Sequence, residues 1–343
     1  MKYRPFGSYI TLECGSGGAA SRSLVEDIIY PHFKNSSYPV LSDASSFLPA
    51  GASSGRLFMT TDTYVVDPPF FPGGDIGRLS VFGTCNDLSV SGARPGYLSA
   101  GFILEEGLPV EDLTRALASM AEAALEAGIS VITGDTKVVP RGKGGGIYIN
   151  TCGIGYAEAV PIPEASSVRP GDAVIVSGPV GAHGIAVLAA RENLAVGGSV
   201  FSDCSFLHPL CSSLFPLGAN LRFMRDATRG GIAAVLNELA SGCGAGLEIE
   251  EERFVVDPDV RAVSDLLGLE PLETANEGVL VAVVSPDSEE KALDALRALK
   301  GGGHAAAVGR VTDKHPGTVV IETAIRGRRV LGFPRGLLLP RIC

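Results

Sequence analysis

Carboxylates flanked by small and hydroxyl residues recur along the chain. They are Asp43, Asp62, Asp87, Asp135 and Asp226, in settings such as Thr61-Asp62-Thr63, Asn86-Asp87 and Gly134-Asp135-Thr136. Hard carboxylate oxygens beside hydroxyls are the ligands that Mg²⁺ with bound phosphates requires. Any one of these residues, in a polar loop at a strand end, could equally form a turn or cap a helix. As a set they predict a site for a metal-bound nucleotide.

Glycine-rich segments could bring backbone N–H groups close to phosphate. They are Gly15 to Gly18, Gly73-Gly74, Gly142 to Gly146 and Gly230-Gly231. None has the GxxxxGK[ST] spacing of a P-loop. The strongest is Thr228-Arg229-Gly230-Gly231, which leads into a predicted helix and so combines a hydroxyl, a guanidinium, backbone donors and a helix dipole.

The segment from Gly178 to Gly184 lies between a predicted strand and a predicted helix. That position is typical of a dinucleotide-binding loop. The segment lacks the GxGxxG spacing, and no acidic residue closes the next strand, so a Rossmann site is disfavoured.

Lys137 and Glu277 are candidates for a general base. Either could act if burial tunes its pKa, although such residues more often form surface ion pairs. The sequence leaves open which of the two takes a proton.

Cys343 is the last residue of a tail that has no helical or strand period. A structural cysteine would be expected in a core rather than at a chain end. Prenylation needs three residues after the cysteine, and none follows. From Phe333 the tail can extend to about 35 Å at about 3.3–3.6 Å per residue, so it could serve as a swinging carrier arm.

Composition limits the class of protein. Of 343 residues, 45% are hydrophobic and 19% charged, and the formal net charge is −10. An acidic chain without long basic clusters argues against nucleic acid or an anionic membrane as the main partner. No apolar run suits a membrane span and no signal peptide is evident, so we expect a cytoplasmic protein. The seven cysteines lack CxxC spacing, which disfavours zinc.

Strand and helix patterns alternate in both halves of the chain and predict two α/β domains. The clearest helix is predicted from Glu111 to Ala127, with acidic residues in its first turn and Gly128 as its C-cap. Two short strands are predicted over Leu57–Thr61 and Tyr64–Val66, and a strand over Ile129–Thr133 is expected to lead into a loop at Gly134–Lys137. The predicted divisions are a Gly-rich arm (1–40), an N-terminal domain (41–158), a C-terminal domain (166–333) and a mobile tail (334–343).

Nearly the whole chain resembles the HypE family of carbamoyl dehydratases, which act in [NiFe]-hydrogenase maturation. This family belongs to the superfamily of aminoimidazole ribotide synthetase and selenophosphate synthetase. The resemblance rests on Phe70-Phe71-Pro72-Gly73-Gly74-Asp75-Ile76-Gly77-Arg78, Asn86-Asp87-Leu88, Gly101-Phe102-Ile103-Leu104-Glu105-Glu106-Gly107, Gly134-Asp135-Thr136-Lys137-Val138-Val139, Asp226-Ala227-Thr228-Arg229-Gly230-Gly231, Ala275-Asn276-Glu277-Gly278 and Pro340-Arg341-Ile342-Cys343. The last motif separates HypE from its superfamily relatives.

The resemblance implies a two-domain PurM-like α/β fold that dimerises through its N-terminal domain. It implies that a partner, HypF, loads a carbamoyl group onto Cys343, that ATP drives its dehydration to a thiocyanate, and that the cyano group passes to iron on a HypC–HypD complex. Lys137 and Glu277 would then position and deprotonate the carbamoyl nitrogen. By the same resemblance, Asp43, Asp62, Asp87 and Asp135 would hold Mg²⁺ through ATP, and the remaining nucleotide contacts would come from Asn86, Thr136, Asp226, Thr228, Gly17 and Gly18.

Two departures from the family pattern bear on the alternatives. Cys14 stands where the family usually has a histidine before the Gly-rich segment, and Ala227 follows Asp226 where proline is usual. Cys14 keeps open a selenophosphate synthetase activity, because that family places a reactive cysteine in its N-terminal arm. A scaffold whose tail only docks partners is the non-enzymatic alternative, and it would not need the aspartates.

Overall fold

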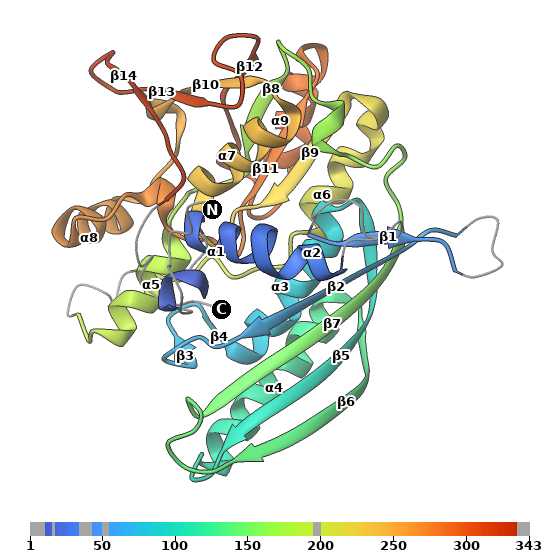
Figure 1. Ribbon diagram of the computed structural model, residues 1–343, viewed down its shortest axis with the longest axis vertical. Coiled ribbons are helices and arrows are strands. Elements are labelled where there is room, and N and C mark those ends of the chain that lie inside the picture. Colours follow the sequence, from blue (N-terminus) through green and yellow to red (C-terminus); the bar gives the residue numbers. More distant parts are fainter. Residues whose placement is uncertain (1–10, 16–17, 34–42, 50–54, 195–199, 335–343) are drawn as a thin grey trace.

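The computed structural model describes residues 11–15, 18–33, 43–49, 55–194 and 200–334. Gly17, the tail from residue 335 onward and Cys343 lie outside the described residues, so the expectations placed on them stay predictions. Two α/β halves make up the described chain, each built on its own sheet (Figure 1).

The N-terminal segment, expected to be a Gly-rich arm, is helical over most of the residues that the structure describes. It consists of η1 (Leu12–Gly15), α1 (Gly18–Leu24), the π-helical η2 (Val25–Ile29) and α2 (Tyr30–Phe33). Cys14 is buried here against Ala20 and is packed by Leu24 and Ile28. A thiol enclosed in an apolar cluster does not favour the alternative of a reactive cysteine in this arm.

Helix α1 lies against the last described residues of the chain. The backbone N–H of Ala19 donates to the carbonyl of Pro334 at 3.4 Å, and the Arg22 guanidinium lies 4.9 Å from the centre of the Phe333 ring. The last residues that the structure describes, Phe333 and Pro334, therefore lie beside the N-terminal helices.

The first sheet has the strand order β1-β2-β7-β5-β6. All its pairs are antiparallel except the parallel pair of β5 and β6. Its strands are β1 (Ser45–Phe47), β2 (Leu57–Tyr64), β5 (Ala93–Glu105), β6 (Ser130–Val139) and β7 (Ile147–Ala157), and a small hairpin of β3 (Phe70–Phe71) and β4 (Gly74–Asp75) precedes the first long helix. In β2 and β7 the side chains alternate between a buried and a more exposed face, as expected for a sheet covered on one side.

Helices α3 (Ile76–Val90) and α4 (Val110–Ala127) cover the inner face of this sheet (Figure 1). The Asp75 side chain caps α3 by accepting from the N–H groups of Gly77 and Arg78 at 2.8 and 3.0 Å. Helix α3 is buried almost throughout, and its polar side chains are paired; Thr84, for example, lies 2.5 Å from Thr151. Gly128 ends α4 in the left-handed conformation, which confirms the predicted C-cap.

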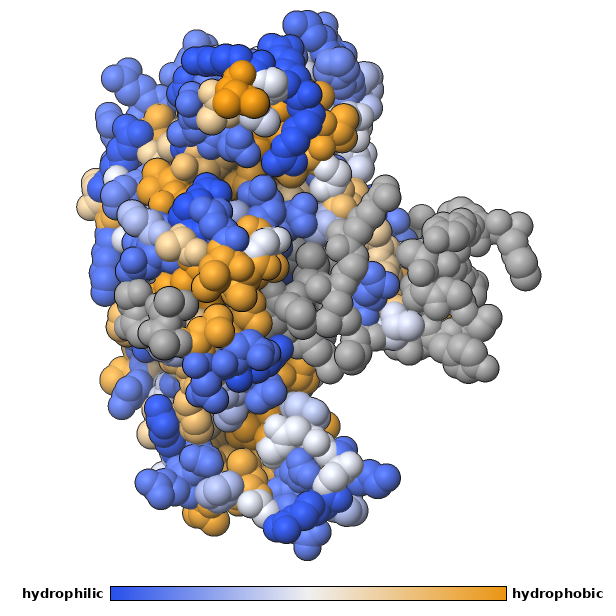
Figure 2. All heavy atoms as spheres, turned by 90° about the vertical axis from the view of Figure 1, so that its left-hand side faces the viewer, coloured by the Kyte–Doolittle hydropathy of each residue, from blue (hydrophilic) through white to orange (hydrophobic). Residues whose placement is uncertain are grey.

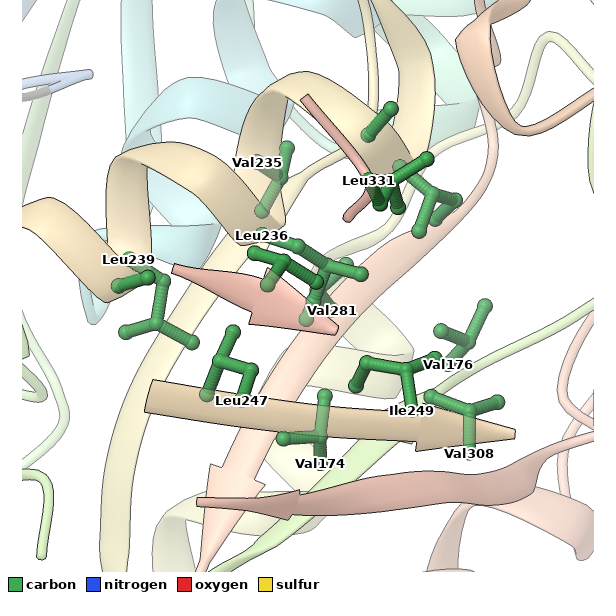
Figure 3. Packing of buried hydrophobic residues seen from close by; sticks show 14 of the residues in the cluster. Val174, Val176, Val235, Leu236, Leu239, Leu247, Ile249, Val281, Val308 and Leu331 are labelled. Carbon is green, nitrogen blue, oxygen red and sulfur yellow. The ribbon is translucent and has the colours of Figure 1, made fainter. Parts of the chain in front are cut away.

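The second sheet has the strand order β14-β13-β10-β12-β8-β11-β9. Its strands are β8 (Ala173–Val176), β9 (Leu221–Asp226), β10 (Gly246–Glu250), β11 (Leu280–Val284), β12 (Ala306–Thr312), β13 (Val319–Glu322) and β14 (Arg328–Val330). The helices of this half are α5 (Ala182–Arg191), α6 (His208–Leu214), α7 (Gly231–Cys243), α8 (Pro258–Leu267) and α9 (Glu289–Arg297), with short helical turns at Ala165–Ser167, Phe215–Asn220, Glu251–Arg253, Pro271–Glu273 and Pro286–Ser288. Figure 3 shows Val235, Leu236 and Leu239 of α7 above the valine, leucine and isoleucine side chains of the sheet, which form one buried cluster.

Two of the predicted strand boundaries were wrong. The two short strands expected between Leu57 and Val66 are the single strand β2, so Asp62 lies inside a strand rather than in a loop. The strand expected to end at Thr133 continues to Val139, so the Gly134–Lys137 motif also lies inside a strand. The physical reason is that Gly134 lies so close to its partner strand that a Cβ there would collide with the carbonyl of Ala100. This glycine permits strand pairing instead of ending it.

Apolar residues gather over the middle of the side of the molecule shown in Figure 2, with hydrophilic residues above and below them. Within the described part of the chain, no helix combines the length and the apolar character needed to cross a membrane.

Candidate active site

Three carboxylates from both halves of the molecule meet at one point. One oxygen each of Asp43, Asp87 and Asp226 lies within 4.8 Å of the other two. Asp43 precedes β1, Asp87 is in α3, and Asp226 is the last residue of β9. Such a set of hard oxygen donors suits a divalent cation. Asp87, predicted in a loop at a strand end, is instead in the last turns of a helix.

The three carboxylates disfavour one another's ionisation. Burial raises the pKa of Asp226 to about 7, and Asp43 adds to this rise. Burial, then Asp226 and Asp43, hold the pKa of Asp87 well above its usual range. The pKa of Asp43 is raised by burial too, although Arg225 opposes the rise. A bound cation would relieve this repulsion, since it favours the ionised form of every carboxylate around it.

The hydroxyl of Thr60 and the guanidinium of Arg225 hold this carboxylate cluster. The Thr60 hydroxyl donates to Asp87 Oδ2 at 2.9 Å and lies 2.7 Å from the carbonyl oxygen of Asp43. Arg225 contacts Asp43 at 2.7 Å and Glu238 at 3.0 Å. Sequence reasoning missed both residues. Their only signal was adjacency, because Thr60 lies two residues before Asp62 and Arg225 lies directly before Asp226.

Asp62 lies beside the carboxylate cluster but is not one of the three residues that meet. Its negative charge raises the pKa values of Asp43, Asp87 and Asp226. Its Oδ1 is 3.8 Å from Arg229, in the loop between β9 and α7. In that loop the carbonyl of Thr228 accepts from the N–H of Gly231 at 2.9 Å. Asp62 and the loop thus form the part of the site nearest the α7 N-terminus.

Glu277 is buried close to the same carboxylates. Its side chain is 3% exposed, and its Oε1 has no hydrogen-bond partner among the residues that the structure describes. Burial raises its pKa well above the usual range, with Asp226 the next cause. A buried carboxyl group with a raised pKa is a better proton acceptor than an ordinary carboxylate, so Glu277 is suited to exchange a proton with a bound substrate.

Three of the predicted site residues lie away from the carboxylate cluster. They are Asp135, Thr136 and Lys137. All three are exposed on β6, where Lys137 pairs with Asp135. Two strands, β7 and β5, separate β6 from β2, and Asp135 follows the residue in register with Asp62. At about 4.8 Å per strand the two aspartates are about 14 Å apart across the sheet. Within a single chain, Lys137 therefore lies on a strand far from Asp62, which is beside the carboxylate cluster.

Asn86, predicted to contact nucleotide, has its amide occupied by protein. Its Nδ2 donates to the carbonyl of Ser205 at 3.0 Å, and its Oδ1 accepts from the N–H of Leu207 at 2.8 Å. The side chain is 1% exposed, so it connects α3 to the 205–207 segment and does not reach toward the carboxylate cluster. Gly18 is buried at the start of α1.

The fold and the carboxylate cluster define a class of protein. Residues 43–157 match the N-terminal domain of AIR synthase related proteins, and residues 169–322 match the C-terminal domain of the same proteins. The fold is thus the expected two-domain arrangement of that superfamily, with the carboxylate cluster between its halves.

Within this class, the chain belongs to the HypE carbamoyl dehydratase family. Carbamoyl dehydratase HypE of Rhizobium leguminosarum bv. viciae is 48% identical over 335 residues, which cover 97% of this chain and 95% of the relative. A HypE chain in a crystal structure of a HypE–HypF complex is similar with a TM-score of 0.85 and 42% identity, covering 91% of this chain and 100% of that one. A crystal structure of HypE in complex with ATP is similar with a TM-score of 0.81 and 44% identity, covering 98% and 100%.

Proposed function

We propose that this chain uses ATP to dehydrate an S-carbamoyl group on Cys343 to an S-cyanate, which supplies the cyanide ligand of the NiFe(CN)₂CO centre during [NiFe]-hydrogenase maturation. One observation carries the proposal. Asp43, Asp87 and Asp226 converge near the buried carboxyl of Glu277, whose Oε1 has no hydrogen-bond partner among the described residues, in a chain that is 44% identical to a HypE solved with ATP. Activation by phosphate and proton transfer can then occur at neighbouring groups.

The carboxylate cluster fits Mg²⁺. Asp43, Asp87 and Asp226 would hold the ion, and Asp226 Oδ2 is buried without a hydrogen-bond partner in the described part of the chain. A buried carboxylate oxygen without a hydrogen-bond partner is available to bind a cation. When bound, Mg²⁺ neutralises the charge that develops on the transferred phosphoryl group. Asp62, which lies beside the carboxylate cluster, would contact the same nucleotide.

The reaction balances in two steps. The carbamoyl oxygen attacks the γ-phosphorus of ATP, ADP leaves, and an amide proton is lost, which gives an O-phosphorylated imidate. The second nitrogen proton is then removed, the C–O bond breaks, and phosphate leaves with the electron pair as the nitrile forms. Glu277 is buried near the carboxylate cluster and is suited to take a nitrogen proton. Lys137 remains the other candidate.

We propose a homodimer because Lys137 and Asp135 are on an uncovered face of the first sheet. In Figure 1, helices α3 and α4 lie behind this sheet, and the lower part of its front face carries no helix. Exposed apolar side chains on or beside this face are Met59, Tyr97, Ile103, Val131, Ile132, Ile154 and Tyr156. A second copy covering them would bury apolar area and could place its Asp135, Thr136 and Lys137 at the site of the first.

The partners are proposed from the membership of the HypE family. HypF would deliver the carbamoyl group, since a HypE relative is solved in complex with HypF. A HypC–HypD complex would accept the cyano group. The compartment would be the cytoplasm, where thiols such as Cys343 stay reduced.

Phosphate release tests the proposal. The full chain, carbamoylated at Cys343, is mixed with Mg-ATP, and phosphate and ADP are counted against the chain. We expect one phosphate and one ADP per carbamoyl group in the first turnover, and neither from the Cys343→Ser chain treated in the same way. ATP hydrolysis at equal rates in both chains would contradict the proposed coupling.

A further inference from the structure

Residues 202–207, named here the strap, run between the two halves of the molecule beside the candidate site. The N–H of Ser202 donates to the carbonyl of Pro72 at 2.8 Å. Asn86 holds the strap at Ser205 and Leu207, at 3.0 and 2.8 Å. The strap is thus hydrogen-bonded to the N-terminal half at both of its ends, and two of these three bonds are made by Asn86, the residue next to Asp87.

The strap also holds the turn that carries Glu277. The carboxylate of Asp203 accepts from the N–H of Glu277 at 3.1 and 3.2 Å and from the N–H of Gly278 at 3.1 Å. The N–H of Ser205 donates to the carbonyl of Glu277 at 3.2 Å. A Cβ at Gly278 would collide with the carbonyl of Asp203, so strap and turn are in direct backbone contact.

Asn276 holds the other side of the same turn. Its Oδ1 accepts from the N–H of Gly181 at 2.7 Å, and its Nδ2 donates to the carbonyl of Ala227 at 2.9 Å. Ala227 directly follows Asp226 of the carboxylate cluster. The backbone of Glu277 is therefore fixed from both sides, whereas its carboxyl oxygen Oε1 lacks a partner within the described residues.

We propose that Asp203 is a positioning residue for the dehydration, because its carboxylate fixes the backbone of Glu277 and so sets the place of the Glu277 carboxyl relative to Asp87. This inference rests on the proposed function. The connection is continuous, since Asn86 beside Asp87 holds the strap and the strap holds Glu277. Burial raises the pKa of Asp203 to about 6, and the N–H groups that it accepts oppose the rise, so near pH 7 it serves mainly as an ionised acceptor.

The substitutions Asp203→Ala and Asp203→Asn distinguish the positioning of Glu277 from a general loss of stability. Asp203→Ala removes the acceptor. In Asp203→Asn the amide oxygen can take the place of Oδ2, which alone lies within reach of both N–H groups. Each variant is carbamoylated as the full chain, and the loss of water from Cys343 with Mg-ATP is followed by intact mass. Thermal unfolding confirms that each variant is folded.

We expect Asp203→Ala to lower kcat by about 10²-fold, the loss typical of a misplaced reacting group, with KM for Mg-ATP nearly unchanged. Asp203→Asn should keep most of the activity. In a Glu277→Gln background Asp203→Ala should cause no further loss, because both changes remove the same contribution. If Asp203→Ala does not fold, Asp203→Glu, which keeps the charge but displaces it, replaces it with the same expectations.

Three outcomes would overturn the inference alone: an unchanged kcat in Asp203→Ala, a loss confined to KM, or a full further loss in the Glu277→Gln background. If the wild-type chain itself lost no water with Mg-ATP, the proposed function would fail and this inference with it.

Discussion

Arg225 of β9 forms an ion pair with Asp43, which precedes β1, at 2.7 Å across the two halves of the molecule. The same guanidinium contacts Glu238 of α7 at 3.0 Å. Asp43 belongs to the carboxylate cluster, so this pair fixes one proposed metal ligand by a residue of the other half. The geometry of the site therefore depends on how the two halves are packed.

Removal of the Arg225 charge should destabilise the chain most when no cation is present. Arg225→Met leaves Asp43 without its partner, which we expect to cost about 2 kcal/mol, less than the ~3–5 kcal/mol of a fully buried pair. Saturating Mg-ATP should reduce this loss, because the cation replaces part of the missing charge. Urea unfolding with and without Mg-ATP measures both values. Arg261→Met, at an exposed position of α8, is the control, and equal losses with and without Mg-ATP would contradict the account.

Asp226→Asn should separate metal binding from stability. The amide keeps the shape of the carboxylate but removes one negative charge from a repulsive cluster, so the metal-free chain should be no less stable than wild type. The affinity for Mg²⁺ in the presence of ATP should fall at least about tenfold, as expected for loss of a charged ligand. Isothermal calorimetry measures the affinity, and Asp265→Asn at an exposed position is the control. Wild-type affinity in Asp226→Asn would exclude this residue as a ligand.

The proposed dimer predicts a charge-sensitive surface on β6. Ile132 is 63% exposed there, and Ile132→Lys should convert a dimer to a monomer, because a charge would then have to be buried in the contact. Dehydration should fall with it if the second copy supplies Lys137. Leu125→Lys, on the exposed side of α4, changes the same kind of residue outside the sheet face and should leave the dimer intact. Sedimentation velocity decides, and an Ile132→Lys chain that stays dimeric would rule out this face.

The buried imidazole of His183 should make the free energy of unfolding fall in acid. It is fully buried beside Phe71 and Ser202, and burial lowers its pKa to about 3. In the unfolded chain the imidazole has a pKa of about 6.5, so below this pH the unfolded chain binds a proton that the folded chain does not. The contribution of neutral His183 to the free energy of unfolding is therefore fully present above pH 6.5 and is lost as the pH falls toward 3.

The free energy of unfolding of wild type should therefore fall about 2 kcal/mol further than that of His183→Gln between pH 6.5 and 5. Urea unfolding at the two pH values measures the difference, and His304→Gln at an exposed position is the control. Parallel curves for wild type and His183→Gln would show that His183 is accessible to protons in the folded chain.

Sequence patterns predicted the elements whose formation depends mainly on neighbouring residues in the chain. The predicted helix from Glu111 to Ala127 is confirmed as α4, because its apolar period, acidic first turn and Gly128 cap agree with one another. Gly134 shows the limit of such reasoning. In sequence it is indistinguishable from a loop glycine, and only the approach of the neighbouring strand shows why it lies inside β6.

The sequence predicted the types of residue in the candidate site but not which of them lie together. Asp87 and Asp226 are far apart in the sequence, and they meet only because β9 of one half ends beside α3 of the other. Asp135 and Lys137 had the same local signature as Asp62, yet the sheet places them on the far edge strand. Asp203 had no signal at all, since its role depends on backbone N–H groups that only folding brings to it.

Intact-protein mass spectrometry of the full chain tests the central claim most directly. The chain is carbamoylated by a HypF partner, the adduct is mapped to Cys343, and Mg-ATP is then added. The account predicts that the adduct loses the mass of one water with ATP and keeps it without ATP. An adduct that stays intact while ATP is hydrolysed would contradict the account and would point to a different phosphoryl acceptor.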